Sequence, residues 1–535
     1  MTQIAGPESI LAPFDGVKLE HSRDSVVLER RGDDFIATFL GDPTSRPIER
    51  KIELTTGSHH FQVYWTTSGK GRELELFPFA YQIAEQRWIE SDHLVLADPE
   101  IVELDSVWNR HCIQCHSTAG KPMLLSGSAT EVGEFGIACE ACHGPAQRHV
   151  EFNRNPQRRY QLHLSEGPDQ SIVNPARLPH DRSSEICGQC HSVNTFYSKQ
   201  DTQYWSEKGF PYRPGDALGD TRKVFHNDTD SSIAGESSFW SDDMVRVNGR
   251  EYNSLLKTPC FQRGELSCLS CHQMHQATDD TRSVDEWAED QLGVAKRDNA
   301  ACVQCHASFA DDQRLAQHTH HRPDSPGSSC YDCHMPHTAY GLHKATRSHQ
   351  ISSPSVATEL QTTRPNACNL CHLDQSIGWA AGRLEAWYGI EAPKLSDAQT
   401  HLAAGVVWSL SGDAGVRALA GWHMGWGPAK EASGTDWLPP YLAELLIDGY
   451  PTVRSVASRS LRVLPGYEDI ETPFEASASA RRATKQRILD TWSEGRNKAA
   501  PANYRLLMDE GQILDRSLFG ELRRRRDRRF VWLVE

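Results

Sequence analysis

The sequence repeats one chemical pattern seven times: two cysteines three residues apart, with a histidine directly after the second. This Cys-x-x-Cys-His pattern is the attachment signature of c-type haem. Each thiol can add to one vinyl group of the porphyrin as a thioether, and the adjoining imidazole is then held against the iron as its proximal ligand. In chain order, motifs 1 to 7 are Cys112/Cys115/His116, Cys139/Cys142/His143, Cys187/Cys190/His191, Cys268/Cys271/His272, Cys302/Cys305/His306, Cys330/Cys333/His334 and Cys368/Cys371/His372. They predict seven covalent haem c groups.

Chance and two other uses of paired cysteines explain this pattern less well. The chain has 15 cysteines and 25 histidines in 535 residues, and a shuffled chain of that composition would contain about 0.02 copies. A zinc site needs four ligands from matched half-sites and gives no reason for the adjoining histidine. A disulfide framework is usual in small secreted domains and leaves the histidines unexplained as well. The motifs use every cysteine except Cys260.

Composition and periodicity outline the elements that must position these motifs, and they predict an α+β chain. Residues 1–105 are expected to form a small β-rich region, with a hairpin around Gly32–Asp34 and a second strand signal in "FQVYW". Residues 106–375 hold the motifs at irregular intervals in loop- and helix-rich sequence, which predicts a seven-haem cytochrome domain. Residues 376–470 have apolar residues at helical spacing, which predicts HEAT-like α-helical repeats, and residues 471–535 form a C-terminal tail.

Charge restricts the partners of the chain. The formal net charge is −15, and the propionates of seven haems would make it more negative, so the surface should repel nucleic acid and favour basic redox partner proteins. The basic run Arg523–Arg526 is expected to be a solvated face rather than a binding patch. The helical repeats are expected to serve as a surface for docking and assembly.

The chemistry of haem attachment also predicts a compartment. Attachment takes place outside the cytoplasm, which predicts a periplasmic or extracellular protein. No stretch approaches about eighteen consecutive apolar residues, so no transmembrane segment is expected. The first residues lack the basic and apolar parts of a signal peptide, and we expect that signal to lie upstream of this sequence.

The motifs and the segments between them resemble a known family. The run "NAACVQCH…HTHHRPDSPGSSCYDCHMPHTAYGLHKATRSHQISSP…TTRPNACNLCH", with "GIACEACHGPAQRHV", "ICGQCH" and "GELSCLSCHQMH", is similar to multihaem c-type cytochromes with doubled CxxCH motifs. That family is related to the hydroxylamine oxidoreductase and multihaem nitrite reductase group and is often fused to HEAT-like helical repeats. The resemblance covers residues 50–375 closely. Because family members commonly carry one more motif near the N-terminus, it also implies a further haem upstream.

A six-coordinate haem needs a second axial ligand, and histidine is far better supplied than methionine. The haem region contains only Met123, Met244, Met274 and Met335, too few for seven positions. Matching the family pattern, the resemblance implies distal ligands at His60, His149, His275, His318, His321 and His349. One further position is left for His180 or His226. Other histidines, including His337, His343 and His423, are expected to be surface, capping or solvated residues.

Two functions remain open from the sequence. If every iron carries two histidines, no iron can bind a substrate, and the chain relays electrons. If one iron has an open position, the alternative is a multihaem oxidoreductase acting on a small nitrogen or sulfur compound. The turn residues Gly144 and Pro145 after motif 2 should carry His149 away from its own haem to a neighbouring one. The unpaired Cys260 is expected to be buried and inert, to pair with another chain, or to act near a haem.

Overall fold

The computed structural model of the chain divides into two compact units. It describes residues 1–20, 25–41, 46–98, 106–124, 129–165, 167–226, 238–495, 501–509 and 514–534. The first unit comprises Met1–Leu94, Glu103–Phe225 and Arg263–Gln291, and the second comprises Val95–Val102, His226–Gln262 and Leu292–Glu535. Motifs 1 to 4 therefore belong to the first unit and motifs 5 to 7 to the second. The α+β prediction is confirmed, while the predicted division into four domains stays a prediction.

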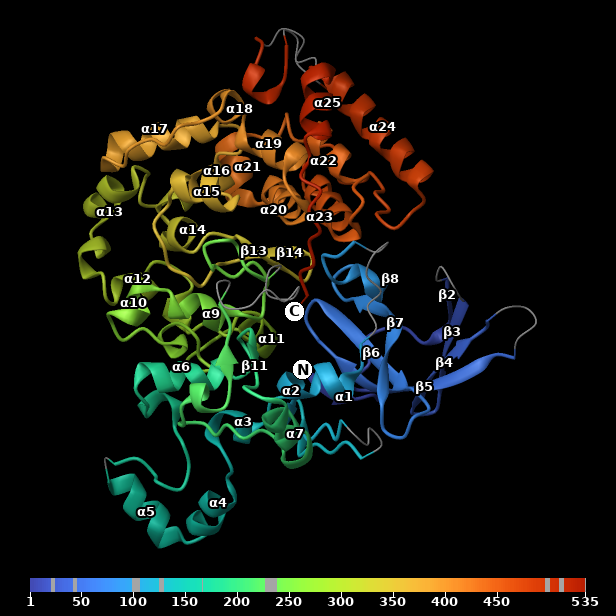
Figure 1. Cartoon of the computed structure of the whole chain (residues 1–535), viewed down its shortest axis with the longest axis vertical. Helices are drawn as coiled ribbons and strands as arrows, with labels where there is room; N and C mark the ends of the chain where they lie inside the picture. Colours follow the sequence, from blue (N-terminus) through green and yellow to red (C-terminus); the bar gives the residue numbers. More distant parts are fainter. Residues whose placement is uncertain are drawn as a thin grey trace. The chain divides into compact units, whose positions relative to one another are not determined.

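An antiparallel sheet forms the N-terminal part of the first unit (Figure 1). Its strands are β1 (Thr2–Ile4), β2 (Asp15–Glu20), β3 (Ser25–Arg31), β4 (Asp34–Phe39), β5 (Ile48–Thr56), β6 (Phe61–Thr67), β7 (Leu74–Gln82) and β8 (Arg87–Glu90). Strands β2 to β8 pair in chain order, and β1 pairs with β5. The predicted hairpin is confirmed, because Arg31 of β3 lies opposite Asp34 of β4. Alternate residues such as Val26 and Leu28 are buried, as expected for strands with one face on a core.

Short helices, 3-10 turns and two-residue strands make up the rest of the first unit. These elements are η1 (Ser91–His93), α1 (Trp108–His111), α2 (Ile113–His116), β9 (Ser117–Thr118), β10 (Glu134–Phe135), α3 (Cys139–His143), α4 (Gln147–Asn153), α5 (Pro156–Leu164), η2 (Pro175–Arg177), α6 (His180–Gly188), β11 (Asn194–Thr195), α7 (Lys199–Lys208), η3 (Leu218–Asp220), β12 (Lys223–Val224), η4 (Cys268–Ser270) and α11 (Val284–Ala288). The loop- and helix-rich texture predicted for the haem region is confirmed here.

The motif-bearing part of the second unit has the same texture. Its elements are α9 (Glu251–Leu256), α10 (Pro259–Gln262), η5 (Val294–Lys296), α12 (Ala300–Val303), η6 (Ala307–Ala310), α13 (Asp312–Thr319), η7 (Pro326–Ser328), α14 (Cys330–His334), β13 (Ala339–Gly341), β14 (Lys344–Thr346), α15 (Val356–Thr362) and α16 (Ala367–Cys371). The unpaired Cys260 lies in α10 and is half-buried. The three-residue strands β13 and β14 pair with each other without forming a larger sheet.

Longer helices follow in the second unit, as the spacing of apolar residues predicts. They are α17 (Ile377–Tyr388), α18 (Asp397–His401), α19 (Ala404–Ser411), α20 (Ala414–Gly425), α21 (Gly427–Ser433), α22 (Pro439–Leu445), α23 (Pro451–Arg462), α24 (Ala478–Gly495), η8 (Tyr504–Leu506) and α25 (Arg516–Arg524). Helix α20 packs between α19 and α23 and also against β13 and β14. The side chain of Asp413 caps α20 by accepting the Val416 N–H, and Pro451 opens α23. Across the described residues, we find no helix of the length and apolarity that a membrane crossing requires.

Candidate haem-attachment sites

Each motif folds around a helical turn. The backbone N–H of the histidine donates to the carbonyl of the first cysteine, four residues earlier, in motifs 1, 3, 4, 5 and 7 at 2.8–3.0 Å. Motifs 2 and 6 are helices α3 and α14 themselves. Residues at i, i+3 and i+4 of a helical turn lie on the same face. In motifs 2 and 6, local folding therefore brings the two sulfur atoms and the imidazole to one side, as the attachment of one porphyrin requires.

In motifs 3 and 4 the helix ends before the motif does. Helix α6 ends at Gly188, and the exposed His191 lies beyond it, tied back by its N–H to the first cysteine of motif 3 at 2.9 Å. The turn η4 ends at Ser270, and the half-buried Cys271 after it leaves the helical region of the backbone, with φ −122° and ψ −43°. These two motifs thus differ from α3 and α14, which continue through the histidine. Thioether formation by Cys271 and iron ligation by His191 stay predictions.

Thiols of different motifs lie beside each other. In the first unit, Cys115 of motif 1 contacts Cys190 of motif 3, with its Sγ 3.9 Å from the Cys190 carbonyl oxygen. Cys187 of motif 3 is hydrogen-bonded to Cys268 of motif 4. Motif 3 therefore contacts both motif 1 and motif 4, and the three motifs form a row in space.

The second unit repeats this arrangement with its own three motifs. The Cys302 thiol of motif 5 hydrogen-bonds Cys330 of motif 6, and that hydrogen bond lowers the pKa of Cys330. Cys333 of motif 6 is close enough to Cys368 of motif 7 for the charge of one thiol to affect the other. Motifs 5, 6 and 7 therefore form a second row. Motif 5 is its exposed end, because both Cys305 and His306 are exposed.

The surroundings of several motif thiols fit thioethers better than thiolates. Burial raises the pKa of Cys112 and Cys333 to about 12 and that of Cys368 to about 11. A thiolate is the form that binds zinc, whereas a thioether carries no charge. In the part of the chain that the structure describes, no three His, Cys, Asp or Glu side chains converge as a metal site would need. All 15 cysteines are free of disulfides, so the zinc and disulfide alternatives lose support.

Three of the predicted distal histidines lie opposite a motif histidine. The ring centres are 6.2 Å apart for His143 and His275, 6.1 Å for His334 and His318, and 6.1 Å for His372 and His321. The ring planes of these pairs differ by 25°, 6° and 28°. Two metal–nitrogen bonds of about 2 Å and two ring radii of about 1.1 Å together span about 6.2 Å. The spacing is thus what an iron atom between the two rings would require.

Hydrogen bonds fix which ring nitrogen is available in several of these histidines. The Nδ1 of His143 lies 2.7 Å from the Val173 carbonyl oxygen, that of His334 lies 3.0 Å from the Ser352 carbonyl, and that of His321 lies 2.6 Å from the Thr319 carbonyl. The Nδ1 of His272 in motif 4 is similarly 3.1 Å from the Asp290 carbonyl. A carbonyl only accepts, so Nδ1 must carry the proton. The Nε2 nitrogen then keeps its lone pair for a metal, which is the usual arrangement of a metal-binding histidine.

Gly327 explains how the His321 ring is kept in place. A β-carbon added at Gly327 would lie 2.2 Å from Cδ2 and 2.5 Å from Cγ of the His321 ring. Such distances are far below van der Waals contact, so only glycine allows the ring to lie there. Gly327 lies in η7, two residues before Ser329, the N-cap of α14. This glycine therefore positions the ring that lies opposite His372.

His149 is held by a carboxylate rather than by a carbonyl. It lies in α4, with Nδ1 3.1 Å from Oδ2 of Asp169. Although burial acts in the opposite direction, hydrogen bonds from Ser171 and Asn153 and the charge of Arg158 keep the pKa of Asp169 well below its usual range. The ionised carboxylate accepts the Nδ1 proton and leaves Nε2 with its lone pair. Gly144 has the expected positive φ of 75°, so the predicted turn after motif 2 is confirmed.

The other predicted distal ligands have different neighbours. The Nε2 of His60 lies 3.3 Å from a carboxylate oxygen of Glu289. His226 has its Nδ1 3.0 Å from Asp243, and His349 has its Nδ1 3.3 Å from the Arg347 carbonyl. His180 is the first residue of α6, the helix that carries Cys187. Ligation by these four histidines stays a prediction.

Some histidines assigned to the surface are buried instead. His343 and His423 have no exposed side-chain area, so their assignment as solvated or surface residues was wrong. His423 lies in α20, between Trp422 and Trp426, and burial lowers its pKa to about 4. The helix is covered on nearly all sides, and ten of its twelve residues are buried. A histidine between two tryptophans in "AGWHMGW" was the sequence signal for this burial.

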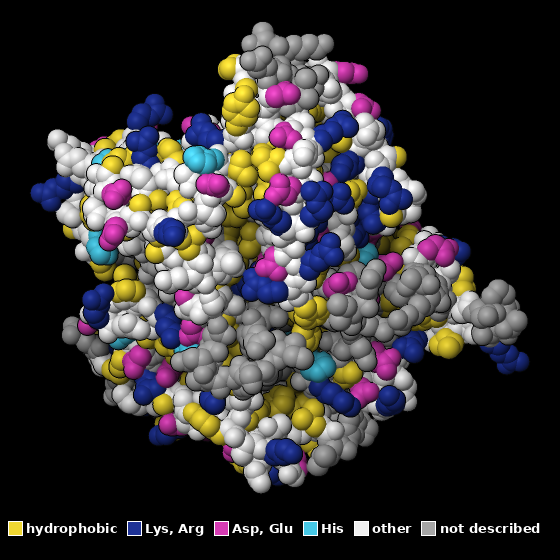
Figure 2. Space-filling view, turned by 45° about the horizontal axis from the view of Figure 1, so that its top comes forward, with side chains coloured by type: hydrophobic (Ala, Val, Ile, Leu, Met, Phe, Trp, Pro, Cys, Tyr) yellow, Lys and Arg dark blue, Asp and Glu magenta, His cyan; other side chains and the backbone are white. Residues whose placement is uncertain are grey.

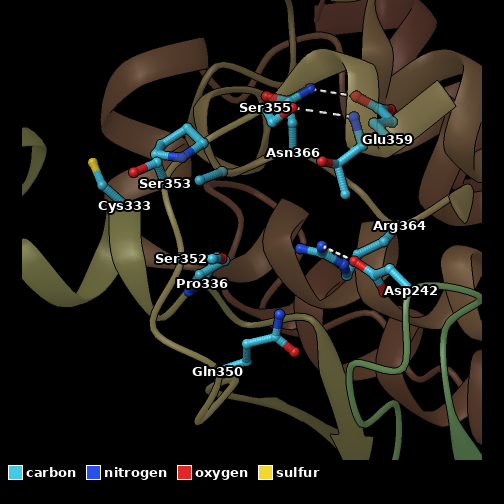
Figure 3. A pocket seen from close by; sticks show the side chains of 13 residues that line it. Asp242, Cys333, Pro336, Gln350, Ser352, Ser353, Ser355, Glu359, Arg364 and Asn366 are labelled. Carbon is cyan, nitrogen blue, oxygen red and sulfur yellow. Dashed lines mark hydrogen bonds and ion pairs between the residues drawn. The ribbon is translucent and has the colours of Figure 1, made fainter. Parts of the chain in front are cut away.

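A polar cavity of about 120 Å³ lies beside motif 6 in the second unit (Figure 3). Its lining includes Cys333 together with the charged residues Asp242, Glu359 and Arg364. Arg364 donates to Asp242 at 2.6 Å. Asp242, Glu359 and Arg364 could not be found from the sequence, because Asp242 is far from the other two in the chain and none of the three follows a spacing that relates it to a motif.

Comparisons with known proteins agree with the motif chemistry. The family model described as "Cytochrome c552" matches residues 121–325, and the model described as "Cytochrome c554 and c-prime" matches residues 86–144. The chain is 20% identical over 298 residues to a protein named "Multiheme cytochrome MtrA" from Shewanella baltica (strain OS185). The alignment covers 49% of this chain and 65% of that protein, so the chain spans less than two thirds of the relative's length. No solved structure matches the chain.

The two family models together cover motifs 1 to 5, and motifs 6 and 7 lie beyond them. The similarities and the repeated CxxCH motif agree on one class of protein. That class is the multihaem c-type cytochromes, to which the chain is similar over residues 86–325.

Proposed function

We propose that the chain binds seven haem c groups, mostly with two histidine ligands each, and relays electrons between redox partner proteins outside the cytoplasm. The observation that carries this proposal is the spacing of 6.1–6.2 Å in three histidine pairs. Each pair joins the proximal histidine of one motif to a histidine that the family pattern implies as a distal ligand. A haem iron held in this way supplies a one-electron couple.

The residues that would hold each haem follow from the motifs. The cysteines of each motif would form the thioethers, and its histidine would form the proximal bond. The seven proximal ligands would be His116, His143, His191, His272, His306, His334 and His372. His275, His318 and His321 would be the distal ligands opposite His143, His334 and His372. We propose His60, His149, His349, His180 and His226 as candidates for the remaining positions.

The surroundings of these histidines are suited to electron relay at low potential. The carbonyl groups that accept from Nδ1 of His143, His334 and His321 increase the electron density on the opposite nitrogen. Two imidazoles on one iron leave no position for a substrate, and histidine in place of methionine favours a lower potential. The contacts between thiols of different motifs favour a close succession of haems within each unit. The exposed motif 5 would be one end of such a succession.

The C-terminal helices offer a surface for a partner. Residues 478–529 contain fourteen Lys and Arg and seven Asp and Glu, a net charge of +7, so the rest of the chain carries −22. Several of these cations are paired within the fold, as Lys485 is with Glu444 and Arg526 with Asp448. The basic face, which we define as the exposed arginines of α24, α25 and the residues directly after them, comprises Arg482, Arg487, Arg516, Arg523, Arg524, Arg525, Arg528 and Arg529. Figure 2 shows Lys and Arg side chains gathered over these helices.

The sequence alone favours a solvated run at Arg523–Arg526. The basic face supports a different interpretation, in which this region binds a partner. A local charge of this sign on an acidic protein steers acidic partners to one place and orients them. We propose that the basic face binds a redox protein with an acidic surface.

The cofactor load and the spin state test the proposal together. The intact mass should exceed that of the polypeptide by seven haems, and a pyridine haemochrome assay should give the same number. The ferric electron paramagnetic resonance spectrum should consist mainly of low-spin signals, since two histidines give a strong ligand field. Fewer haems, or several high-spin signals with stoichiometric carbon monoxide binding, would contradict the relay and favour the oxidoreductase alternative.

A further inference from the structure

The polar cavity beside motif 6 has features that electron relay alone does not use. Figure 3 shows Cys333 on one side of it, and Glu359 hydrogen-bonded to Asn366 and Arg364 paired with Asp242 on the other. Among the described residues, the cavity has two buried polar atoms without a hydrogen-bond partner, Oε1 of Gln350 and Nε of Arg364. Buried polar atoms are almost always satisfied, and a cavity of about 120 Å³ has room for several water molecules. We therefore expect water in this cavity.

Glu359 is the acidic residue in this cavity that is least accessible to solvent. It lies in α15 and is 4% exposed. Its Oε1 accepts from the indole N–H of Trp408 at 2.9 Å, and its Oε2 accepts from the side-chain amide of Asn366. Burial raises the pKa of Glu359 to about 7, although both hydrogen bonds and the charge of Arg364 act in the opposite direction. Glu359 can therefore gain or lose a proton near neutral pH without leaving the interior.

The charged groups around Glu359 are few. Arg364 is the cation that acts on it, and Asp242 pairs with Arg364 from a different part of the unit. The neighbouring elements supply neutral groups, Trp408 from α19 and Asn366 from the N-terminus of α16. A charge added near Glu359 is therefore offset by few neighbouring charges. A carboxyl that gains or loses a proton is the group best able to offset it.

The position of Glu359 relates it to two attachment motifs. Asn366, which donates to Glu359, is the N-cap of α16 and accepts from the Asn369 N–H, so it helps to form the helix of motif 7. The Glu359 charge is also one of the causes, after burial, that raise the pKa of the Cys368 thiol in that motif. The same cavity reaches Cys333 of motif 6. Glu359 is thus near attachment cysteines of both motif 6 and motif 7.

We propose that Glu359 is a redox-linked proton-binding site, which releases a proton when an electron leaves the centres held by motifs 6 and 7 and takes one up when an electron returns. This inference rests on the proposed function, because it needs redox-active iron at these motifs. In the oxidising direction, one ferrous iron becomes ferric and its electron passes to a redox partner protein. The O–H bond of the Glu359 carboxyl breaks, and the proton leaves through the cavity water to solvent. The carboxylate that remains offsets the positive charge gained by the iron.

The experiment is a spectroelectrochemical titration of the complete haem-loaded chain at pH values between about 5 and 9. Where one proton follows one electron, a tenfold change in proton activity shifts a potential by about 59 mV. The wild-type protein should show this slope near neutral pH for the centres held by motifs 6 and 7, with flatter regions on both sides. Glu359→Gln should remove the slope, since glutamine cannot ionise. Glu385→Gln, which removes the same charge from an exposed position of α17, should retain it.

A second variant tests the direction of the effect. Arg364→Gln removes the cation that favours the ionised carboxyl, so the sloping region should move to higher pH. If Glu359→Gln does not fold, redox-induced infrared difference spectra of the wild-type protein serve instead, and a protonated carboxyl band should disappear on oxidation. A wild-type slope that persists in Glu359→Gln would overturn the inference. Flat potentials in a wild-type protein with seven low-spin haems would overturn it while leaving the proposed function intact.

Discussion

Removal of one distal histidine should open one iron and leave the covalent attachment unchanged. In His275→Ala, motif 2 keeps both cysteines and its proximal His143, so the thioethers and one axial bond are retained. The alanine side chain cannot reach across the 6.2 Å that separates the two ring centres. The iron held by motif 2 should then be five-coordinate or bind water.

The expected size of the change in spin state and in carbon monoxide binding follows from the number of motifs. One of seven centres changes, so about one seventh of the ferric haem should become high-spin. Carbon monoxide binding to the reduced protein should increase by one molecule per chain relative to wild type. His318→Ala and His321→Ala should each give the same increment, because each ring lies opposite a different motif histidine. The triple variant should give an increment of three.

The assays are electron paramagnetic resonance of the ferric protein and carbon monoxide titration of the ferrous protein. His163→Ala, which removes an exposed histidine of α5, is the matched control and should behave as wild type. Added imidazole should restore the low-spin spectrum of His275→Ala, which a general loss of structure would prevent. If His275→Ala has the spectrum and the carbon monoxide stoichiometry of His163→Ala, our reasoning from ring spacing is wrong.

Four further changes test other parts of the structure. Gly327→Ala should open the same iron as His321→Ala, since its β-carbon would displace the ring, and carbon monoxide titration should find that one added site. His149→Ala should likewise add one carbon monoxide site with all haems still attached, whereas an unchanged stoichiometry would make His149 a surface residue. Asp448→Asn leaves the buried Arg417 without its bidentate partner and should destabilise the second unit by about 3 to 5 kcal/mol in urea denaturation. Charge reversal of the basic face should abolish salt-dependent binding of an acidic redox protein, and binding that is insensitive to it would exclude that face.

The local geometry of the motifs could be predicted from the sequence, but their neighbours could not. The spacing of Cys330, Cys333 and His334 already implies one helical turn, because i, i+3 and i+4 share a face. The family resemblance implied that His318 and His321 are distal ligands. Only the fold shows that His318 lies opposite His334 and His321 opposite His372, because α13 and the segment after it pass between motifs in a way that no periodicity encodes.

The spacing of the motif residues also did not predict the residue at which each helical turn ends. The same three-residue interval continues a helix through His334 in motif 6 but leaves Cys271 and His191 beyond the ends of η4 and α6. His191 is exposed, although it stands in the same place in its motif as the half-buried His334. The motif residues have the same types and spacing in every copy, so the motif alone leaves this difference undetermined.

Burial was the property that the sequence conveyed least well. His423 and Glu359 are polar residues of types that are usually exposed, yet both are buried, His423 beside Trp422 and Trp426 and Glu359 beside Trp408 of a remote helix. Helix α19 supplies Trp408 to Glu359, and this contact joins the helical region to the motif-bearing part of the unit. Such contacts depend on how α19 and α15 meet, and the apolar pattern of either helix alone leaves this undetermined.

The position of the polar cavity bears on the direction of the proposed electron transfer within the second unit. Motif 5 is exposed, whereas Cys333 and Cys368 of motifs 6 and 7 are half-buried. Cys333 lines the same cavity as Glu359, and Cys368 is close enough to be affected by the Glu359 charge. Positive charge gained away from bulk solvent is costly unless a nearby group can become negative. A carboxyl that titrates near neutral pH reduces that cost for motifs 6 and 7, while solvent reduces it for motif 5. The two ends of the row can therefore be kept at comparable potentials by different means, which is what a relay needs if electrons are to pass along it in both directions.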